Sequence, residues 1–162
     1  MSGTKTLLQE LLDREAIRDL PLRYCDCVWR NDIDGLVRLF ARKGAFIYRS
    51  GDTEAGAEGH AALRAFYAKG LDIAPRPFIH NHVIELKGGK KATGRCYLDL
   101  RNGRAQMQFM GAGHYDDVYV KEKGEWKFAR RDFTALRMDE NPVAEVAPSA
   151  PATKTRRKSP AR

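Results

Sequence analysis

The stretch FIHNHVIELKGGKKATGRCYLDLRNGRAQMQFMGAGHYDDVYVKEKGEWKFARRDFTALRM, residues 78–138, decides the fold, because apolar and polar residues alternate through most of it. Such alternation is typical of β-strands that bury one face. Residue pairs that favour tight hairpin turns separate the alternating runs: Gly88-Gly89, Asn102-Gly103 and Lys123-Gly124. We therefore expect four long strands, joined in succession as antiparallel hairpins.

The residues upstream of this stretch have helical spacing instead. In TLLQELLDREAIRDLPLRYCDCVWRND, residues 6–32, apolar side chains recur four or eight positions apart, which is the spacing of one helix face. Pro21 lies inside this run, and a proline removes one backbone donor and clashes with the preceding turn. We expect two helices, or one kinked helix, with the break near Leu20. Asn31 or Asp32 then caps a short helix over residues 33–42.

One further strand and one further helix are expected before the meander. GAFIYRSG, residues 44–51, is predicted as a strand bounded by glycines, and residues 52–59 are predicted as a polar loop. HAALRAFYAKGL, residues 60–71, is predicted as a helix that buries Leu63, Phe66 and Tyr67. Together these elements predict a single α+β domain over residues 1–141.

The formal charge is +8 over 162 residues, but half of it comes from one segment. Residues 143–162 hold five basic side chains against Glu145 alone, and proline and alanine dominate the rest. This composition predicts a disordered tail over residues 142–162. The tail suits a weak electrostatic contact with RNA, DNA or an acidic partner, but a solubilising terminus is the simpler interpretation. We therefore do not expect a nucleic-acid partner.

Neither membrane insertion nor export is expected. No apolar run is long enough to span a bilayer, and MSGTKTLLQELLDRE at the N-terminus lacks the order of basic, apolar and small residues of a signal peptide. We expect a cytoplasmic protein. Its three cysteines, Cys25, Cys27 and Cys96, are an odd number and are predicted as plain, mostly buried thiols.

Two histidines, His80 and His82, lie in the first predicted strand of the meander. Residues two apart on a strand point to the same face, so both imidazoles could reach one metal ion or one substrate. Glu85 lies an odd number of residues away and points to the other face, and no feature of the sequence places His60 or His114 beside the pair. We therefore expect no metal. Proton transfer by one of the two histidines and a purely structural pair both stay open.

Several segments, taken in order, resemble the SnoaL-like branch of the NTF2-like superfamily over residues 7–136. They are DREAIRDLPLRYCDCVWRNDIDGLVRLF, GAF, GHAALRAFYAKG, NHVIEL, ATGRCYL and GHYDDVYVKEKGEWKFARR. The resemblance implies an NTF2-like cone, in which a curved mixed sheet wraps around N-terminal helices and encloses a deep apolar cavity. It also implies a homodimer or homotrimer.

The resemblance further implies chemistry without a cofactor. Members of the family dehydrate scytalone, eliminate hydrogen chloride, isomerise steroids, close polyketide rings or hydrolyse epoxides, while others are binding modules or non-catalytic subunits. In the dehydratase and dehydrochlorinase members an aspartate orients a histidine. The matching positions here are Trp29 and Pro77, so the usual proton-transferring pair is absent.

Two accounts of the site follow from this departure. On the first, the protein is a cofactor-independent lyase or isomerase for an apolar aromatic or polycyclic molecule. A histidine is then the base, and an arginine or a tyrosine donates a hydrogen bond to a substrate oxygen that gains negative charge. The expected catalytic residues are His80, His82, Arg131 and Tyr24. Tyr48 is a further candidate for the donor. The expected substrate contacts are Trp29, Tyr48, Phe46, Cys96, Leu98 and Tyr115. On the second account the cavity only binds a ligand, or the domain supports assembly, and Trp29 is a packing wall.

Arg131 is the most informative of these residues, because an arginine facing an apolar cavity is costly without a polar partner. Arg130 and Arg131 are adjacent on one predicted strand, so one of them faces outward, and the sequence leaves open which one. The carboxylates of Asp26, Asp116 and Asp117 are predicted to lie in solvent or in turns.

Overall fold

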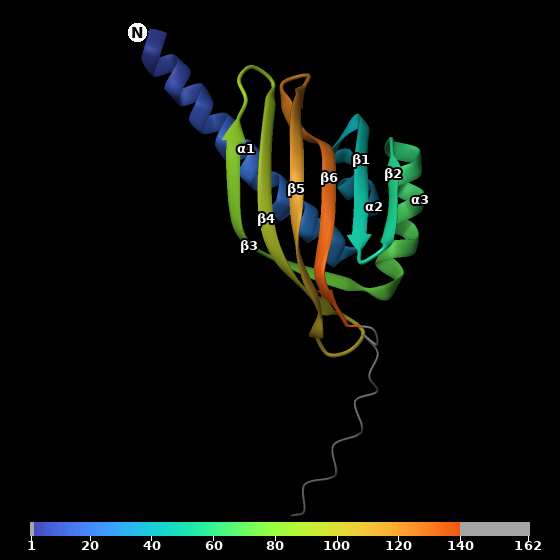
Figure 1. Ribbon diagram of the computed structural model, residues 1–162. Helices are drawn as coiled ribbons and strands as arrows, with labels where there is room; N and C mark the ends of the chain where they lie inside the picture. The colour runs from blue at the N-terminus through green and yellow to red at the C-terminus, as the bar shows by residue number, and fades with distance from the viewer. Residues whose placement is uncertain (1, 140–162) are drawn as a thin grey trace, which may run out of the picture.

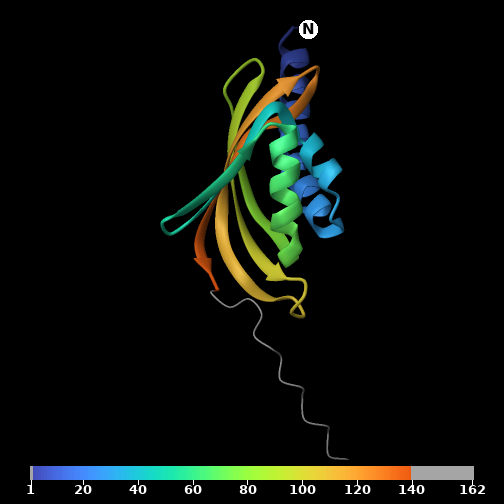
Figure 2. The same ribbon diagram turned by 90° about the vertical axis from the view of Figure 1, so that its right-hand side faces the viewer.

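The computed structural model describes residues 2–139, which form one curved six-stranded sheet with three helices on its concave face (Figures 1 and 2). The elements in chain order are α1 Ser2–Arg30, α2 Ile33–Arg38, β1 Phe40–Ser50, β2 Thr53–Glu58, α3 His60–Gly70, a 3-10 turn Leu71–Ile73, β3 Pro75–Leu86, β4 Lys91–Asn102, β5 Gln108–Glu122 and β6 Glu125–Met138. The predicted α+β class is confirmed. The predicted tail over residues 142–162 lies outside the described residues.

The sheet has the strand order β2-β1-β6-β5-β4-β3. The pair β1–β6 is parallel, and the other four neighbouring pairs are antiparallel. The predicted meander of four strands is therefore confirmed, and the expected glycine turns at residues 88–89 and 123–124 connect its strands. Gly88, Gly89 and Gly124 have positive φ angles there, a conformation in which glycine carries no steric penalty.

Of the two alternatives predicted near Leu20, two separate helices are wrong, because α1 continues as one helix through Pro21. One face of α1 packs against the sheet through Ile17, Leu20, Tyr24 and Val28, each at most 5% exposed. A proline inside a helix costs about 3 kcal/mol. Burial of this apolar face offsets that cost, since each buried side chain of this size contributes about 1.5–3 kcal/mol.

The region between α1 and α3 differs from its prediction in two places. The short helix ends at Arg38 rather than at residue 42, because Phe40 begins β1 and is 1% exposed beneath the sheet. Residues 53–58, predicted as loop, form the edge strand β2. This strand pairs only with β1 and is mostly exposed, so its sequence has no alternating pattern. The predicted cap is confirmed, since the Asp32 side chain accepts a hydrogen bond from the Gly35 backbone.

The core lies between the helices and the concave face of the sheet. Its fully buried members come from every layer and include Ile17, Leu36, Phe40, Leu63 and Phe128. None of the helices within residues 2–139 is long and apolar enough to cross a membrane.

Candidate functional site

An apolar chamber of about 210 Å³ lies at one end of the core, between α1, α3 and the concave face of the sheet. Its apolar lining consists of Val28, Phe46, Phe66, Gly70, Leu71, Ile73, Pro75, Pro77, Leu100, Met110, Phe133 and Met138. Its polar side chains are all tyrosines, namely Tyr24, Tyr48, Tyr67 and Tyr115. Among residues 2–139, neither a charged side chain nor either histidine of β3 is part of this lining.

Three of these tyrosines meet at the buried end of the chamber. The Tyr24 hydroxyl donates to the Tyr67 hydroxyl at 3.3 Å, and the Tyr24 ring contacts the Tyr115 ring at 5.7 Å between centroids. Burial raises the pKa of Tyr24 to about 12 and raises the pKa values of Tyr67 and Tyr115 well above 10. The hydroxyls are therefore neutral at physiological pH and act as hydrogen-bond donors and acceptors.

Arg131 lies directly behind these rings, with none of its surface exposed. Its guanidinium carbon is 4.4 Å from the centroid of Tyr24, 3.9 Å from that of Tyr115 and 4.2 Å from that of Phe128. Ring faces at these distances attract a cation. The structure thus settles which neighbour faces inward: Arg131 does, whereas Arg130 is exposed and pairs with Asp132.

Asp117 neutralises Arg131 inside the protein. The Nε and Nη2 atoms of Arg131 donate to the two Asp117 oxygens at 2.9 and 3.0 Å. Burial alone would lower the pKa of Arg131, but the carboxylate raises it well above its usual value, so the guanidinium stays charged. The prediction that Asp117 is a solvent or turn carboxylate is wrong, because it is 2% exposed. Asp26 and Asp116 do form exposed ion pairs, with Arg30 and Arg95.

His82 ends a hydrogen-bonded chain that starts at this ion pair. The Tyr119 hydroxyl donates to Asp117 Oδ2 at 2.9 Å, so it must accept from the Nε2 atom of His82, 3.0 Å away. This arrangement places the imidazole proton on Nε2. His82 Nδ1 is buried and makes no hydrogen bond. Burial lowers the pKa of His82, which keeps the ring neutral.

The two β3 histidines do not share a face, contrary to the prediction. The pairing of β3 with β4 shifts register between Ile79 and His82, and such a bulge reverses the alternation of side chains. His80 therefore points outward, 52% exposed, with its Nε2 3.5 Å from Asp99. No cluster of potential metal ligands occurs among residues 2–139, and His60 instead contacts the backbone oxygen of Phe40.

Trp29 and Pro77, at which the resemblance would have placed an aspartate and a histidine, contact each other. The Trp29 indole Nε1 donates to the Pro77 backbone oxygen at 2.9 Å, and its ring packs edge-on against Phe78. Trp29 is 39% exposed and does not fill the chamber. Of the two residues, only Pro77 is part of the chamber lining among residues 2–139, and neither side chain carries an ionisable group.

The predicted site residues divide into two groups. Tyr24, Phe46, Tyr48 and Tyr115 line the chamber. The remaining predicted residues lie elsewhere, in the core or on the surface: Trp29, His80, His82, Cys96, Leu98 and Arg131. Cys96 Sγ instead accepts from Arg131 at 3.6 Å, and the three cysteines are free thiols as predicted.

The sequence did not single out Tyr67, Met110 and Phe133 as chamber residues. Tyr67 was recognisable only as part of the buried stripe of α3. The other two sit on inward positions of the predicted meander, where alternation identifies a buried face but not a void.

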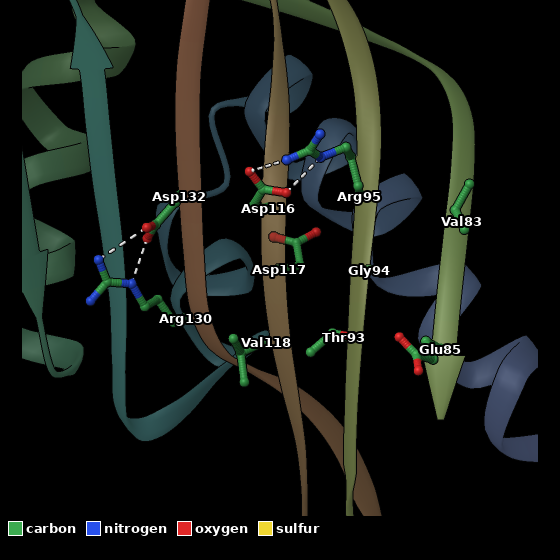
Figure 3. Close-up of a pocket in the computed structure, with 10 residues that line it drawn as sticks. All are labelled: Val83, Glu85, Thr93, Gly94, Arg95, Asp116, Asp117, Val118, Arg130 and Asp132. Carbon is green, nitrogen blue, oxygen red and sulfur yellow. Dashed lines mark hydrogen bonds and ion pairs between the residues drawn. The ribbon is translucent and has the colours of Figure 1, made fainter. Parts of the chain in front are cut away.

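A wider groove lies on the convex face of the sheet, over β3 to β6 (Figure 3). Each of its charged side chains already has a partner, either within the groove or beside it; Glu85 pairs with Lys87 and Asp117 with Arg131. Arg95 makes two hydrogen bonds to Asp116, and Arg130 makes two to Asp132. Because these pairs satisfy one another in solvent, the groove offers no unpaired charge to a ligand, and the chamber is the stronger candidate site.

Comparisons with known proteins agree with this fold. An NTF2-like protein with a cystatin-like fold from Novosphingobium aromaticivorans superposes with a TM-score of 0.73 at 21% identity, over 88% of this chain and 94% of its own. A candidate scytalone dehydratase from the same organism gives 0.68 at 21% identity, over 86% and 91%, and LinA gives 0.73 at 19% identity, over 89% and 98%. No curated protein matches. The model of the SnoaL-like domain matches residues 9–132, and the chain therefore belongs to the SnoaL-like family.

Proposed function

We propose that the protein binds an apolar aromatic small molecule in the chamber, and that one oxygen of this molecule meets the tyrosine hydroxyls. The observation that supports this proposal is the chamber itself, an apolar void whose polar side chains within the described chain are all tyrosines. Small-molecule sites are typically apolar pockets with a few placed polar groups. Since a cavity of about 150 Å³ accepts benzene, about 210 Å³ suits one substituted ring or two fused rings.

The position of the polar groups supports a ligand with an oxygen at one end. The Tyr24 and Tyr67 hydroxyls share one hydrogen bond, which leaves one of their two protons for a further acceptor. All three buried hydroxyls are neutral, so they favour a carbonyl, hydroxyl or ether oxygen and do not require an anionic ligand. The charge of Arg131 is already matched by Asp117.

The test is a pair of ligands that differ by one hydroxyl, naphthalene and 2-naphthol, titrated by fluorescence or calorimetry. One hydrogen bond is worth about 0.5–1.5 kcal/mol, so 2-naphthol is expected to bind about 2- to 12-fold more tightly. Tyr67→Phe is expected to remove this preference while retaining naphthalene binding. Tyr97→Phe, which alters a tyrosine outside the chamber, is the matched control and is expected to retain it.

A substitution that fills the chamber tests whether the ligands bind there. Met110→Trp places a larger side chain in the lining and is expected to abolish binding of both ligands, with circular dichroism confirming the fold. If neither ligand binds the wild-type protein, or if Met110→Trp binds them as well as wild type does, the proposal fails.

A second candidate function is a lyase or isomerase reaction of the same ligand. The observation that favours it is the Arg131 guanidinium behind Tyr24 and Tyr115, because a nearby positive charge makes a hydroxyl a better donor to an oxygen that gains negative charge. Similarity of fold to LinA and to a candidate scytalone dehydratase is compatible with it. No chamber side chain is a base near neutral pH, however, and neither histidine lines the chamber.

Turnover distinguishes the two functions. A lyase or isomerase converts a bound hydroxylated or carbonyl ligand, which mass spectrometry of the ligand pool detects, and Tyr24→Phe would then lower kcat. A binding protein returns the ligand unchanged after prolonged incubation. Product formation that survives both Tyr24→Phe and Met110→Trp would place any activity outside the chamber.

A further inference from the structure

We propose that the first turns of α1 form a self-association surface, through which two copies of the chain pair in antiparallel orientation. The surface consists of Leu7, Leu8, Leu11 and Leu12, here called the leucine arm. Their exposed fractions are 63%, 57%, 65% and 55%. Single exposed leucines are common, but four contiguous ones mark an interaction surface.

The spacing gathers the four side chains into one stripe. Residues three and four apart are neighbours on a helix, so Leu7 meets Leu11 and Leu8 meets both Leu11 and Leu12. Gln9 and Glu10 lie on the other side of the helix. The stripe is therefore continuous, and none of its four side chains carries a charge.

The arm projects from the fold. In Figure 1 the first turns of α1 run past the edge strand β3, away from α2 and α3. The first buried residue of the helix is Ile17. Among residues 2–139 no element covers the four leucines, so the apolar stripe lacks a partner within the described chain.

Two of the charged residues next to the stripe, Asp13 and Arg14, have partners within the described chain. Asp13 accepts from Gln9 at 3.1 Å, from Lys121 at 2.7 Å and from Trp126 at 2.9 Å. Arg14 donates to the Ile84 backbone oxygen. These contacts hold the base of the arm against the sheet and leave its leucine side free.

The sequence of the arm indicates that its partner is a second copy. Leu-Leu-Gln-Glu-Leu-Leu, residues 7–12, keeps the same apolar pattern when read backwards. Under a twofold axis between positions 9 and 10, Leu7 of one copy faces Leu12 of the other, and Leu8 faces Leu11. An isologous contact requires this kind of self-complementarity.

A membrane surface fits the arm less well. Residues 2–18 carry three basic and three acidic side chains, whereas helices that lie on membranes have an excess of lysine and arginine on their polar side. Four leucines a side are also far fewer than the roughly 20–30 residues that each partner contributes to a standard stable interface. We therefore expect a reversible dimer with a Kd on the order of 10 μM.

Sedimentation velocity of the full chain, from about 1 to 500 μM around that Kd, tests the proposal. Wild type is expected to shift from monomer to dimer over this range. Leu8→Lys and Leu11→Glu, each at an exposed position, are each expected to raise the Kd at least 30-fold. Leu136→Lys changes another exposed leucine, on β6 and 68% exposed, and is the matched control with no expected change.

Double substitutions test whether the two leucine arms pair in antiparallel orientation. In the antiparallel pair, position 8 of one copy faces position 11 of the other, so Leu8→Lys with Leu11→Glu sets opposite charges against each other and is expected to recover dimer. Leu8→Lys with Leu11→Lys sets like charges together and is expected to stay monomeric.

Four outcomes would overturn the proposal. They are a wild-type monomer at every concentration, a dimer that Leu8→Lys leaves unchanged, a dimer lost in Leu136→Lys, and binding to phosphatidylglycerol vesicles that Leu8→Lys abolishes. None of them bears on the chamber, since ligand binding by monomeric variants is measured separately.

Discussion

Replacing Arg131 by methionine is the perturbation whose effect the structure defines most sharply. Arg131 and Asp117 are both fully buried and joined by two hydrogen bonds. Methionine retains most of the side-chain volume but leaves the Asp117 carboxylate with Tyr119 as its remaining hydrogen-bond donor among the described contacts. Removing one partner of a buried pair costs about 3–5 kcal/mol.

This loss of unfolding free energy is a large part of the total for a domain of this kind, which is about 5–15 kcal/mol. In urea unfolding the midpoint falls with little change in slope, and in a thermal scan Tm falls by about 10 °C. The double variant Arg131→Met/Asp117→Leu removes both charges, so its unfolding free energy is expected to lie within about 2 kcal/mol of wild type.

Arg95→Met provides the matched control. Arg95 makes the same two-bonded contact with Asp116, but both side chains are nearly half exposed, so its unfolding midpoint is expected to stay at the wild-type value. Equal losses in Arg131→Met and Arg95→Met, or additive losses in the double variant, would refute the reasoning that burial makes this pair critical.

Three further predictions concern protonation, thiol reactivity and packing. Because burial lowers the pKa of His82, the unfolded chain binds a proton that the folded chain resists. The free energy of unfolding is therefore expected to fall as the pH drops through about 6.5. Urea unfolding of His82→Gln should show a smaller fall over the same pH range. An equal fall in wild type and variant would contradict this prediction. Burial also raises the pKa of Cys25 to about 12 and that of Cys96 to about 11. A thiol reagent at pH 8 should therefore label these cysteines slowly in the native protein and quickly in urea. Fast labelling of the native protein would contradict this prediction. Gly113→Ala should cost about 1–3 kcal/mol, because the added carbon would lie 2.3 Å from the Thr134 backbone oxygen. Gly70→Ala, where an added carbon meets nothing within 4 Å, is its control, and equal unfolding midpoints for the two variants would count against the packing argument.

Much of the fold could be predicted from the sequence because period-two alternation and glycine turns are local signals. β3 to β6 and α3 follow them closely. Local sequence signals failed at Pro21, which was expected to interrupt the helix, and at β2, which was expected to be a loop. Packing of α1 on the sheet overrides the cost of the proline, and β2 pairs at the sheet edge without burying an apolar face. Neither effect is visible in a single segment.

The site was less predictable, because it depends on small shifts between strands. One register shift in β3 separates His80 from His82, which alternation alone would have placed together. Asp117 looked like its neighbour Asp116, yet the inward position on β5 makes it the partner of Arg131. Similarity to the family located Tyr24 and Tyr115 but also suggested Trp29, which lies outside the chamber.

Occupancy of the chamber is tested most directly by labelling the methionine methyl groups with ¹³C and titrating 2-naphthol by NMR. Met110 and Met138 line the chamber, whereas Met107 does not. The account predicts shifts and ligand contacts at the methyl groups of Met110 and Met138, with Met107 unchanged. A ligand that binds while Met110 and Met138 keep their resonances would contradict it.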